Sequence, residues 1–452
     1  MLVNQHKNVL FSLIESTLSE SVINRIARET DFMKRVGKVP PSHFLNTLLF
    51  NEQEMSKTSL PDLTADLDQT YGIDISKVAL HKKFSPNAVR FMKSILSELL
   101  SKQLAKDRDE GFKLCFPRIK IKDSTKFSLP DSYGGDYKGY GNYSKKNGRM
   151  SLQYEYDLVS GNWLSLQMTK GLRNDQQDSK ETLSDITKGD LHIRDLGYVT
   201  PVYLSALVEK EAFFLNRLPP QAGVFTMDGQ PLDRGKIMRK FNRNKLTAME
   251  LLVMVYDKNR VPCRLVIETV DDEEYGKRLE KARMKAKSRK VGITESHKKK
   301  LRLNTYITNV NSSILPITAI RKTYYLRWQV ELIFKTWKSV FAINKIKKVK
   351  KERLECHLLA KLMWILINYR LFNTCNAHVK KQDNMQGMSV LIFFKRCRKF
   401  AASLKQVLLK RKSISTWLKQ VYLPLISDCL CVPPRKKQTH YESLKINIKA
   451  LG

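Results

Sequence analysis

Two short segments of this chain repeat one pattern, and that repeat constrains the fold more than any other feature. Residues 119–123 read Ile-Lys-Ile-Lys-Asp, and residues 191–195 read Leu-His-Ile-Arg-Asp. Apolar residues at every second position predict a β-strand. Each predicted strand ends in an aspartate, so Asp123 and Asp195 become the first candidate site residues.

The segments around this repeat predict an α/β fold. Residues 151–159 and 163–168 alternate in polarity on either side of Ser160-Gly161-Asn162, which is typical of a hairpin. Thr200 and Pro201 are a helix start, and the apolar run 212–217 follows as a strand. The predicted order is strand, hairpin, helix, strand, helix, strand. A mixed order of this kind favours an α/β sheet.

Helical patterns dominate the region before this core. We predict an N-terminal helical DNA-binding domain over residues 1–110, in which Gly72 ends one helix, Ser76 starts a short one and Ser85-Pro86 start a longer one. These three helices are a helix-turn-helix candidate. Three packed helices without any DNA contact fit the same pattern, because small helical bundles are common.

Composition shifts divide the rest of the chain. We predict a catalytic α/β domain over residues 111–375, interrupted by a β-rich insertion at about 218–303 that contains a hairpin and a dense basic stretch. A separate domain is the alternative for the insertion. Residues 376–452 are helical and basic, and we expect them to be a possible dimerisation region.

The chain carries a large positive charge. It has 81 Lys and Arg against 44 Asp and Glu, a formal net charge of +37, and the excess recurs along its length. Such an excess favours a polyanion as partner, because binding phosphates releases condensed counterions. For any single basic run, a solvated surface remains the alternative.

Other classes of protein fit poorly. No run of apolar residues is long enough to span a membrane, and seven scattered cysteines show no zinc or disulfide pattern. We expect a cytoplasmic protein that does not contact membranes.

The segment 323–341 has no Pro or Gly and is predicted to be one helix with two stripes. The buried stripe consists of Leu326, Val330, Ile333, Phe334, Trp337 and Phe341, and the polar stripe consists of Tyr324, Arg327, Glu331, Lys335 and Lys338. Taken alone, Glu331 and Lys335 would form an ordinary ion pair on a solvated face.

The spacing of the polar stripe is more specific than that. The pattern resembles the signature of the bacterial IS-four family of cut-and-paste insertion-sequence transposases. That signature reads Tyr, two residues, Arg, three residues, Glu, six residues, Lys, as do residues 324–338 here. In that family two aspartates at strand ends precede the glutamate, and Asp123 and Asp195 match them in order. The resemblance implies an RNase H-like catalytic core with Asp123, Asp195 and Glu331 as catalytic residues and metal ligands. It also implies Mg²⁺, with Mn²⁺ as a substitute, and a bacterial protein associated with the nucleoid.

The same resemblance implies the partners. Tyr324, Arg327, Lys335 and Lys338 would hold double-stranded DNA, at the terminal inverted repeats of the element, while its ends are cleaved and joined to target DNA. A homodimer is expected in the DNA complex, because two ends are brought together. Related enzymes stack a flipped base on an aromatic residue of the insertion during a hairpin step, whereas this chain has Asn304 at that position and Tyr306 nearby.

Two readings from other classes remain open. One is a DNA-binding protein without catalysis, such as a repressor or a domesticated transposase. The other is an RNase H-like nuclease that acts on structured nucleic acid. Cleavage of DNA that carries the element ends would separate both from a transposase.

Overall fold

A computed structural model gives the fold. It describes residues 18–51, 54–106, 116–140, 147–219, 222–232, 246–288, 290–382, 388–397, 401–408 and 411–417, together with a few positions between 237 and 244 and Cys429. The chain divides into two compact units: unit 1 is Met1–Glu110, Ser124–Leu172 and Val330–Lys437, and unit 2 is Gly111–Asp123, Arg173–Gln329 and Gln438–Gly452. Strand β1 (Ile119–Leu129) and helix α13 (Trp328–Ser339) each continue from one unit into the other.

The strands form the predicted α/β arrangement. The order is β3-β2-β1-β4-β5-β9-β8-β7-β6. The bounds are β2 Gly148–Asp157, β3 Trp163–Lys170, β4 Leu191–Arg194, β5 Phe213–Arg217, β6 Val224–Phe225, β7 Ala248–Val255, β8 Val261–Thr269 and β9 Leu303–Thr308. Strands β1, β4 and β5 run parallel, and β2 and β3 form the predicted hairpin. The predicted α/β class is therefore confirmed.

In unit 2 the strands of the insertion continue the sheet. Strand β9 pairs with β5 on one side and with β8 on the other, both antiparallel. Leu204 of α8 (Pro201–Glu209), Phe214 of β5, Val253 of β7 and Leu265 of β8 belong to one buried cluster. The hairpin β7–β8 thus shares a hydrophobic core with α8 and β5.

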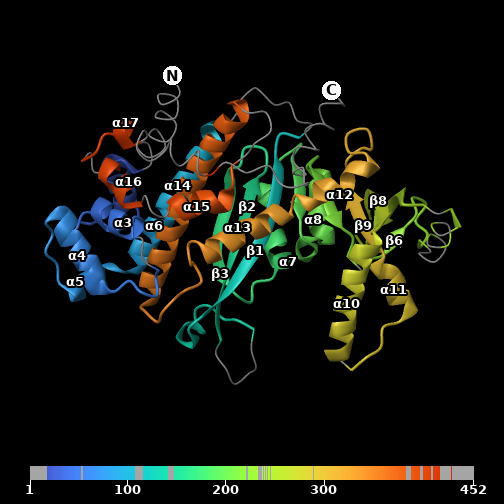
Figure 1. Cartoon of the computed structure of the whole chain (residues 1–452), viewed down its shortest axis with the longest axis horizontal. Coiled ribbons are helices and arrows are strands. Elements are labelled where there is room, and N and C mark those ends of the chain that lie inside the picture. The colour runs from blue at the N-terminus through green and yellow to red at the C-terminus, as the bar shows by residue number, and fades with distance from the viewer. Residues whose placement is uncertain are drawn as a thin grey trace. The chain divides into compact units, whose positions relative to one another are not determined.

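The other helices of unit 2 precede or follow these strands. They are α7 (Asp175–Glu181), α10 (Asp272–Ser288), α11 (Glu295–Leu301) and α12 (Ile317–Tyr325), with short 3₁₀ turns at Leu183–Asp185 and Leu196–Tyr198. Figure 1 shows α10 and α11 side by side and extending away from the strands. The predicted start of α8 is confirmed, because the Thr200 hydroxyl accepts a hydrogen bond from the Tyr203 amide.

Unit 1 is mostly helical, as its sequence predicts. It contains α2 (Glu20–Glu29), α3 (Pro41–Leu49), α4 (Leu60–Tyr71), α5 (Lys77–Lys83), α6 (Pro86–Lys106), α14 (Lys351–Gln382), α15 (Val390–Cys397), α16 (Ala401–Leu408), α17 (Ile414–Trp417) and a 3₁₀ turn at Asp131–Tyr133. The predicted boundary at 375 falls inside α14. Of the predicted C-terminal region 376–452, residues 418–428 and 430–452 lie outside the described residues.

The helix boundaries of the helix-turn-helix candidate are confirmed. Gly72 ends α4 at φ 66°, a left-handed conformation that favours glycine. The Ser76 hydroxyl caps α5 by accepting from the Ala79 amide, and the Ser85 hydroxyl accepts from the Ala88 amide at the start of α6. Among the described helices of both units, none is long and apolar enough to cross a membrane.

Candidate active site

The two candidate aspartates follow paired positions of neighbouring parallel strands in unit 2. Ile121 of β1 pairs with Ile193 of β4, and Lys122 pairs with Arg194. Asp123 and Asp195 are the next residues along the chain, so both lie at the carboxyl end of the β1–β4 pairing. Strand β4 ends just before Asp195, as predicted, whereas β1 continues past Asp123 to Leu129, so the predicted end of β1 is wrong. This edge of a parallel sheet is where α/β proteins place their ligands.

Arg327 joins the two aspartates. Its Nη1 donates a hydrogen bond to Asp123 Oδ2 at 3.0 Å, and its Nε lies 3.8 Å from Asp195 Oδ1. The side chains of Asp123 and Arg327 are each 16% exposed and that of Asp195 is 47% exposed. A guanidinium therefore lies against both carboxylates, where a positive charge is stabilised by two negative ones.

Two buried cations, which we did not single out in the sequence, hold the positions directly before the two aspartates. Lys122, directly before Asp123, forms a 2.5 Å ion pair with Asp178 of α7. Arg194, directly before Asp195, reaches Ser179 of the same helix at 3.4 Å and lies 4.3 Å from the centroid of the Tyr203 ring. Each aspartate thus follows a residue held on α7. The signal was present, because both segments read apolar-cation-Asp.

The expected continuous helix 323–341 is wrong. The structure has α12 ending at Tyr325 and α13 beginning at Trp328. Between them the amides of Leu326 and Arg327 bond to carbonyls three residues back, so the chain tightens into a 3₁₀-like turn. Leu326 is 3% exposed, so it is buried as predicted although the helix is interrupted at this position.

The break changes the position of Tyr324. We expected it on the polar stripe, yet it is 9% exposed and its ring lies 5.4 Å from that of Tyr306 on β9. Burial raises the pKa of Tyr324 to about 12, against the opposing charge of nearby Arg327. Its phenol is therefore protonated at neutral pH and lies next to the guanidinium that contacts both aspartates.

The remaining signature residues lie on α13 within unit 1. Glu331 is in the first turn, and Glu331 and Lys335 are exposed while Lys338 is half-buried. Lys338 donates to the Lys126 carbonyl at 3.2 Å, and burial, helped by the charge of Arg149, lowers its pKa. The opposite face packs on the hairpin, with the Trp337 ring 5.0 Å from Tyr154 and 5.2 Å from Trp163. The two-stripe prediction is confirmed for this helix.

Asn304, the residue at the aromatic position of relatives, is 2% exposed in β9. Its Oδ1 accepts hydrogen bonds from Arg217 at 3.2 Å and from Arg278 at 2.8 Å. Tyr306 lies on the same face of the strand and is 4% exposed. This part of unit 2 therefore gathers guanidinium groups around a buried amide.

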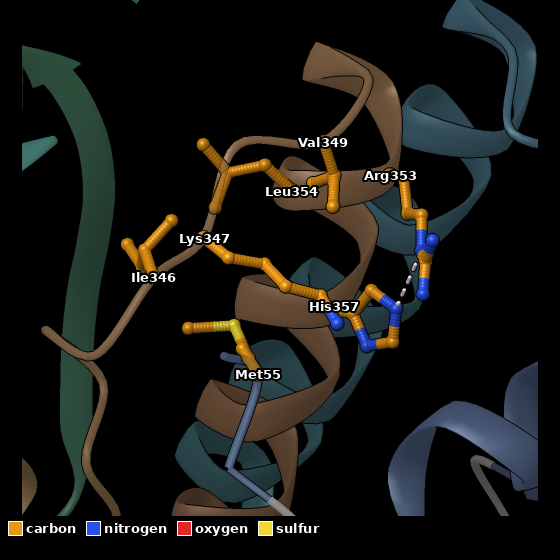
Figure 2. Close-up of a pocket in the computed structure, with 7 residues that line it drawn as sticks. All are labelled: Met55, Ile346, Lys347, Val349, Arg353, Leu354 and His357. Atoms are coloured by element: carbon orange, nitrogen blue, oxygen red, sulfur yellow. Dashed lines mark hydrogen bonds between the residues drawn. The ribbon is translucent and has the colours of Figure 1, made fainter. Parts of the chain in front are cut away.

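Among the described residues, no three His, Cys, Asp or Glu side chains lie close enough to hold one ion, so Asp123 and Asp195 make up a two-carboxylate arrangement. A small pocket in unit 1 is lined by Met55, Ile346, Lys347, Val349, Arg353, Leu354 and His357 (Figure 2). It contains none of the predicted site residues.

Comparison with known proteins decides the family. Residues 115–367, more than half of the chain, match the family described as Transposase DDE domain. The chain is a member of the DDE transposases. The matched range contains all seven predicted site residues, which run from Asp123 to Lys338.

The alignments of this transposase with individual relatives cover most of its own length and most of the length of each relative. It is 30% identical over 371 residues to the transposase for insertion sequence element IS231F of Bacillus thuringiensis subsp. israelensis, covering 78% of each chain. It is 31% identical over 369 residues to that of IS231C of B. thuringiensis subsp. berliner, covering 77% of each. For IS1151 of Clostridium perfringens the identity is 26% over 401 residues, covering 85% of each.

Among solved structures, the transposase is similar to the piggyBac transposase in a synaptic complex with hairpin DNA. The TM-score is 0.42 at 11% identity, over 98% of this chain and 84% of that one. Family membership and the relatives together make this chain a DNA-cleaving transposase of the insertion-sequence type, and enzymes of the family generally use a divalent metal.

Proposed function

We propose that this transposase cleaves DNA at the terminal inverted repeats of its own insertion sequence and joins the ends to target DNA. The observation that carries the proposal is the contact of Arg327 with both Asp123 and Asp195, at 3.0 and 3.8 Å. These three residues come from separate parts of the sequence and meet where the pairing of the parallel strands β1 and β4 ends. Charged groups gathered at that edge favour a reaction centre over a structural role.

Asp123 and Asp195 fit a divalent metal site. The side chains of Asp123 on β1 and Asp195 after β4 both reach the Arg327 guanidinium. Their oxygens are therefore directed toward the same positively charged group. Carboxylate oxygens are the hard ligands that Mg²⁺ prefers, and Mg²⁺ needs only a few of them because it keeps several waters. Bound Mg²⁺ would stabilise the charge that develops on the attacking and leaving oxygens of a phosphodiester. Mn²⁺ would bind the same ligands.

Glu331 is proposed as the third carboxylate. It follows Arg327 by four residues and lies in the first turn of α13, with its side chain exposed. The buried face of α13 packs on Tyr154 and Trp163, so the helix orientation that exposes Glu331 is fixed by aromatic contacts. Phosphoryl transfer needs no side-chain nucleophile, because water or a DNA 3′-hydroxyl attacks.

The cationic residues are proposed to hold the DNA backbone. Arg327 would form paired hydrogen bonds to a phosphate, and Lys335 and Lys338 would act as point charges. The protonated Tyr324 phenol lies beside Arg327 and would help to orient its guanidinium. Lys335 is exposed and meets a phosphate directly, whereas half-buried Lys338 would first release the Lys126 carbonyl.

The wider assembly follows from the reaction. We propose that α4, α5 and α6 bind the terminal repeats, and that two copies of the chain hold two ends. Exposed Lys77, His81 and Lys82 on α5 give this short helix a cationic outer face, which supports a role in DNA binding. A DNA-bound enzyme of this charge would be found with the nucleoid.

The test uses purified full-length protein, Mg²⁺ and linear DNA that carries the terminal repeats of the element encoding the chain. Cleavage at the repeat boundary is expected. A duplex of the same length and composition with scrambled repeats is the matched control and should stay intact. Binding without cleavage under all metal conditions would indicate a non-catalytic DNA-binding protein, and equal cleavage of both duplexes would indicate a general nuclease.

A further inference from the structure

Helix α10 has two parts with different surroundings. In its first turns Glu274 pairs with Arg278 and with Arg321 of α12, at 2.5 Å for the latter. Arg278 also donates to Asn304 of β9 at 2.8 Å, and the guanidinium of Arg302 lies 4.0 Å from the Tyr275 ring centroid. The start of α10 is thus held on β9 and α12, and the rest of the helix extends away from the strands beside α11 (Figure 1).

The extended part is strongly basic and only weakly neutralised. Beyond Arg278 its exposed charged residues are Glu280, Lys281, Arg283, Lys285 and Lys287. Lys277 pairs with Glu273 at 2.5 Å near the start of the helix. Within the part of the chain that the structure describes, none of the four later cations has a carboxylate within 4.0 Å. Cations near the C-terminal end of a helix are stabilised by the helix dipole. That stabilisation leaves the charges of these four side chains available to a partner.

The cations lie on two flanks of one exposed surface. With about 100° per residue, Lys281 and Lys285 fall on one side, and Arg283 and Lys287 fall on the other side. Met284 lies between the two flanks and is 64% exposed. The half-buried residues Leu279, Ala282 and Ala286 occupy the remaining side of the helix. Glu280 lies one turn before Met284 in the same interval, so two pairs of exposed cations flank an exposed methionine and one carboxylate.

We propose that this half of α10 binds in the major groove of duplex DNA. The groove is about 12 Å wide and admits one α-helix, with a phosphate backbone along each side. The two flanks would each meet one backbone, and Met284 would face the base edges. From Lys281 to Lys287 the helix rises about 9 Å, which matches roughly three phosphates of one strand. This inference rests on the proposed function only for the choice of DNA as the polyanion.

The experiment measures binding of full-length protein to a duplex of unrelated sequence, in EDTA, as a function of salt concentration. Variants K281Q/K285Q and R283Q/K287Q each remove one flank, and glutamine keeps the helix propensity. K180Q/K258Q is the matched control, because it removes the same charge from exposed positions outside α10. Circular dichroism verifies that each variant is folded.

Each flank variant is expected to reduce the salt slope by about one to two units, since one phosphate contributes about 0.9. The control should keep the wild-type slope, and Met284→Glu should weaken binding at every salt concentration. Unchanged slopes in both flank variants overturn the inference, and an effect of one flank alone overturns the groove geometry. Cleavage of the terminal repeats by the same variants in Mg²⁺ is scored separately, so loss of the groove contact and failure of the proposed function are distinguishable.

Discussion

Arg327 occupies the position at which a cation would meet both aspartates. Its guanidinium is only 16% exposed and contacts Asp123 and Asp195 directly, so it neutralises them in the protein alone. The same side chain is the proposed phosphate ligand. A metal ion and Arg327 therefore compete for the carboxylates, and a DNA phosphate would withdraw Arg327 from them.

This competition predicts a change in metal affinity. Arg327→Ala should bind Mn²⁺ more tightly than wild type in the absence of DNA, by about tenfold or roughly 1.4 kcal/mol, because a competing cation is removed. Isothermal titration calorimetry with Mn²⁺ measures this affinity for both proteins. Lys188→Ala is the control, because that side chain is exposed and pairs only with Glu211 at 2.5 Å. Equal or weaker Mn²⁺ binding by the Arg327 variant contradicts the competition.

His357 gives unit 1 a defined pH dependence. It is buried on α14, where its Nε2 lies 3.4 Å from the Arg353 guanidinium (Figure 2). Burial, together with the charges of Arg353, Lys361 and Lys347, lowers the pKa of His357 to about 3. The unfolded chain binds a proton at about pH 6.5, so between pH 6.5 and 3 the unfolded state holds more protons and stability falls as pH falls.

The corresponding prediction concerns the free energy of unfolding between pH 6.5 and 4. His357→Gln should remove up to about 1.4 kcal/mol per pH unit from its slope. Urea unfolding at several pH values measures the slope. His81→Gln serves as the control, since His81 is exposed on α5. If wild type and the His357 variant show the same slope, His357 is not held neutral in the folded protein.

At the scale of elements, α7 holds β1 at the residue directly before Asp123. Asp178 is fully buried and pairs with Lys122 at 2.5 Å and with Arg173 at 3.1 Å. Removing it leaves a buried lysine without its main partner. We therefore expect Asp178→Ala to cost about 3 to 5 kcal/mol of unfolding free energy, as for other broken buried pairs. Glu211→Ala breaks an exposed pair and should have little effect in the same urea titration. A small loss for Asp178→Ala would mean that Lys122 finds another partner.

The sequence predicted most elements because their signals are local. Alternating apolar residues and capping serines located β4, α5 and α6 and the start of β1, although β1 continues past Asp123 to Leu129. The turn at Leu326 and Arg327 could not be predicted, because neither residue breaks a helix and the segment contains no Pro or Gly. Tyr324 was misplaced for the same reason.

Within the site, chain order predicted the aspartates but not their contacts. Asp123 and Asp195 were found because strand register brings equivalent positions together. The contact of Arg327 with both required the turn before α13, and the roles of Lys122 and Arg194 required knowledge that α7 lies beneath them. Long-range packing of this kind leaves no periodic signal in a single sequence. The catalytic roles themselves stay predictions.

At the scale of the whole molecule, charge and reaction together predict an assembly. A net charge of +37 would oppose association of free chains, and bound DNA would offset that repulsion. Two chains with two terminal-repeat duplexes are expected in the complex that forms without cleavage in Ca²⁺. Mass photometry of that complex measures its composition. A complex of one chain with one duplex, at protein concentrations that support cleavage with Mg²⁺, contradicts the proposed dimer.

The central claim is that Asp123, Asp195 and Glu331 act together in metal-dependent cleavage. The most direct measurement compares end cleavage in Mg²⁺ by wild type with that by Asp123→Asn, Asp195→Asn and Glu331→Gln, each at matched DNA occupancy. All three variants are expected to bind the terminal repeats and to lose cleavage by about a thousandfold or more, the scale of losing a charged transition-state contact. Wild-type cleavage by any one variant would remove that carboxylate from the active site and contradict the account.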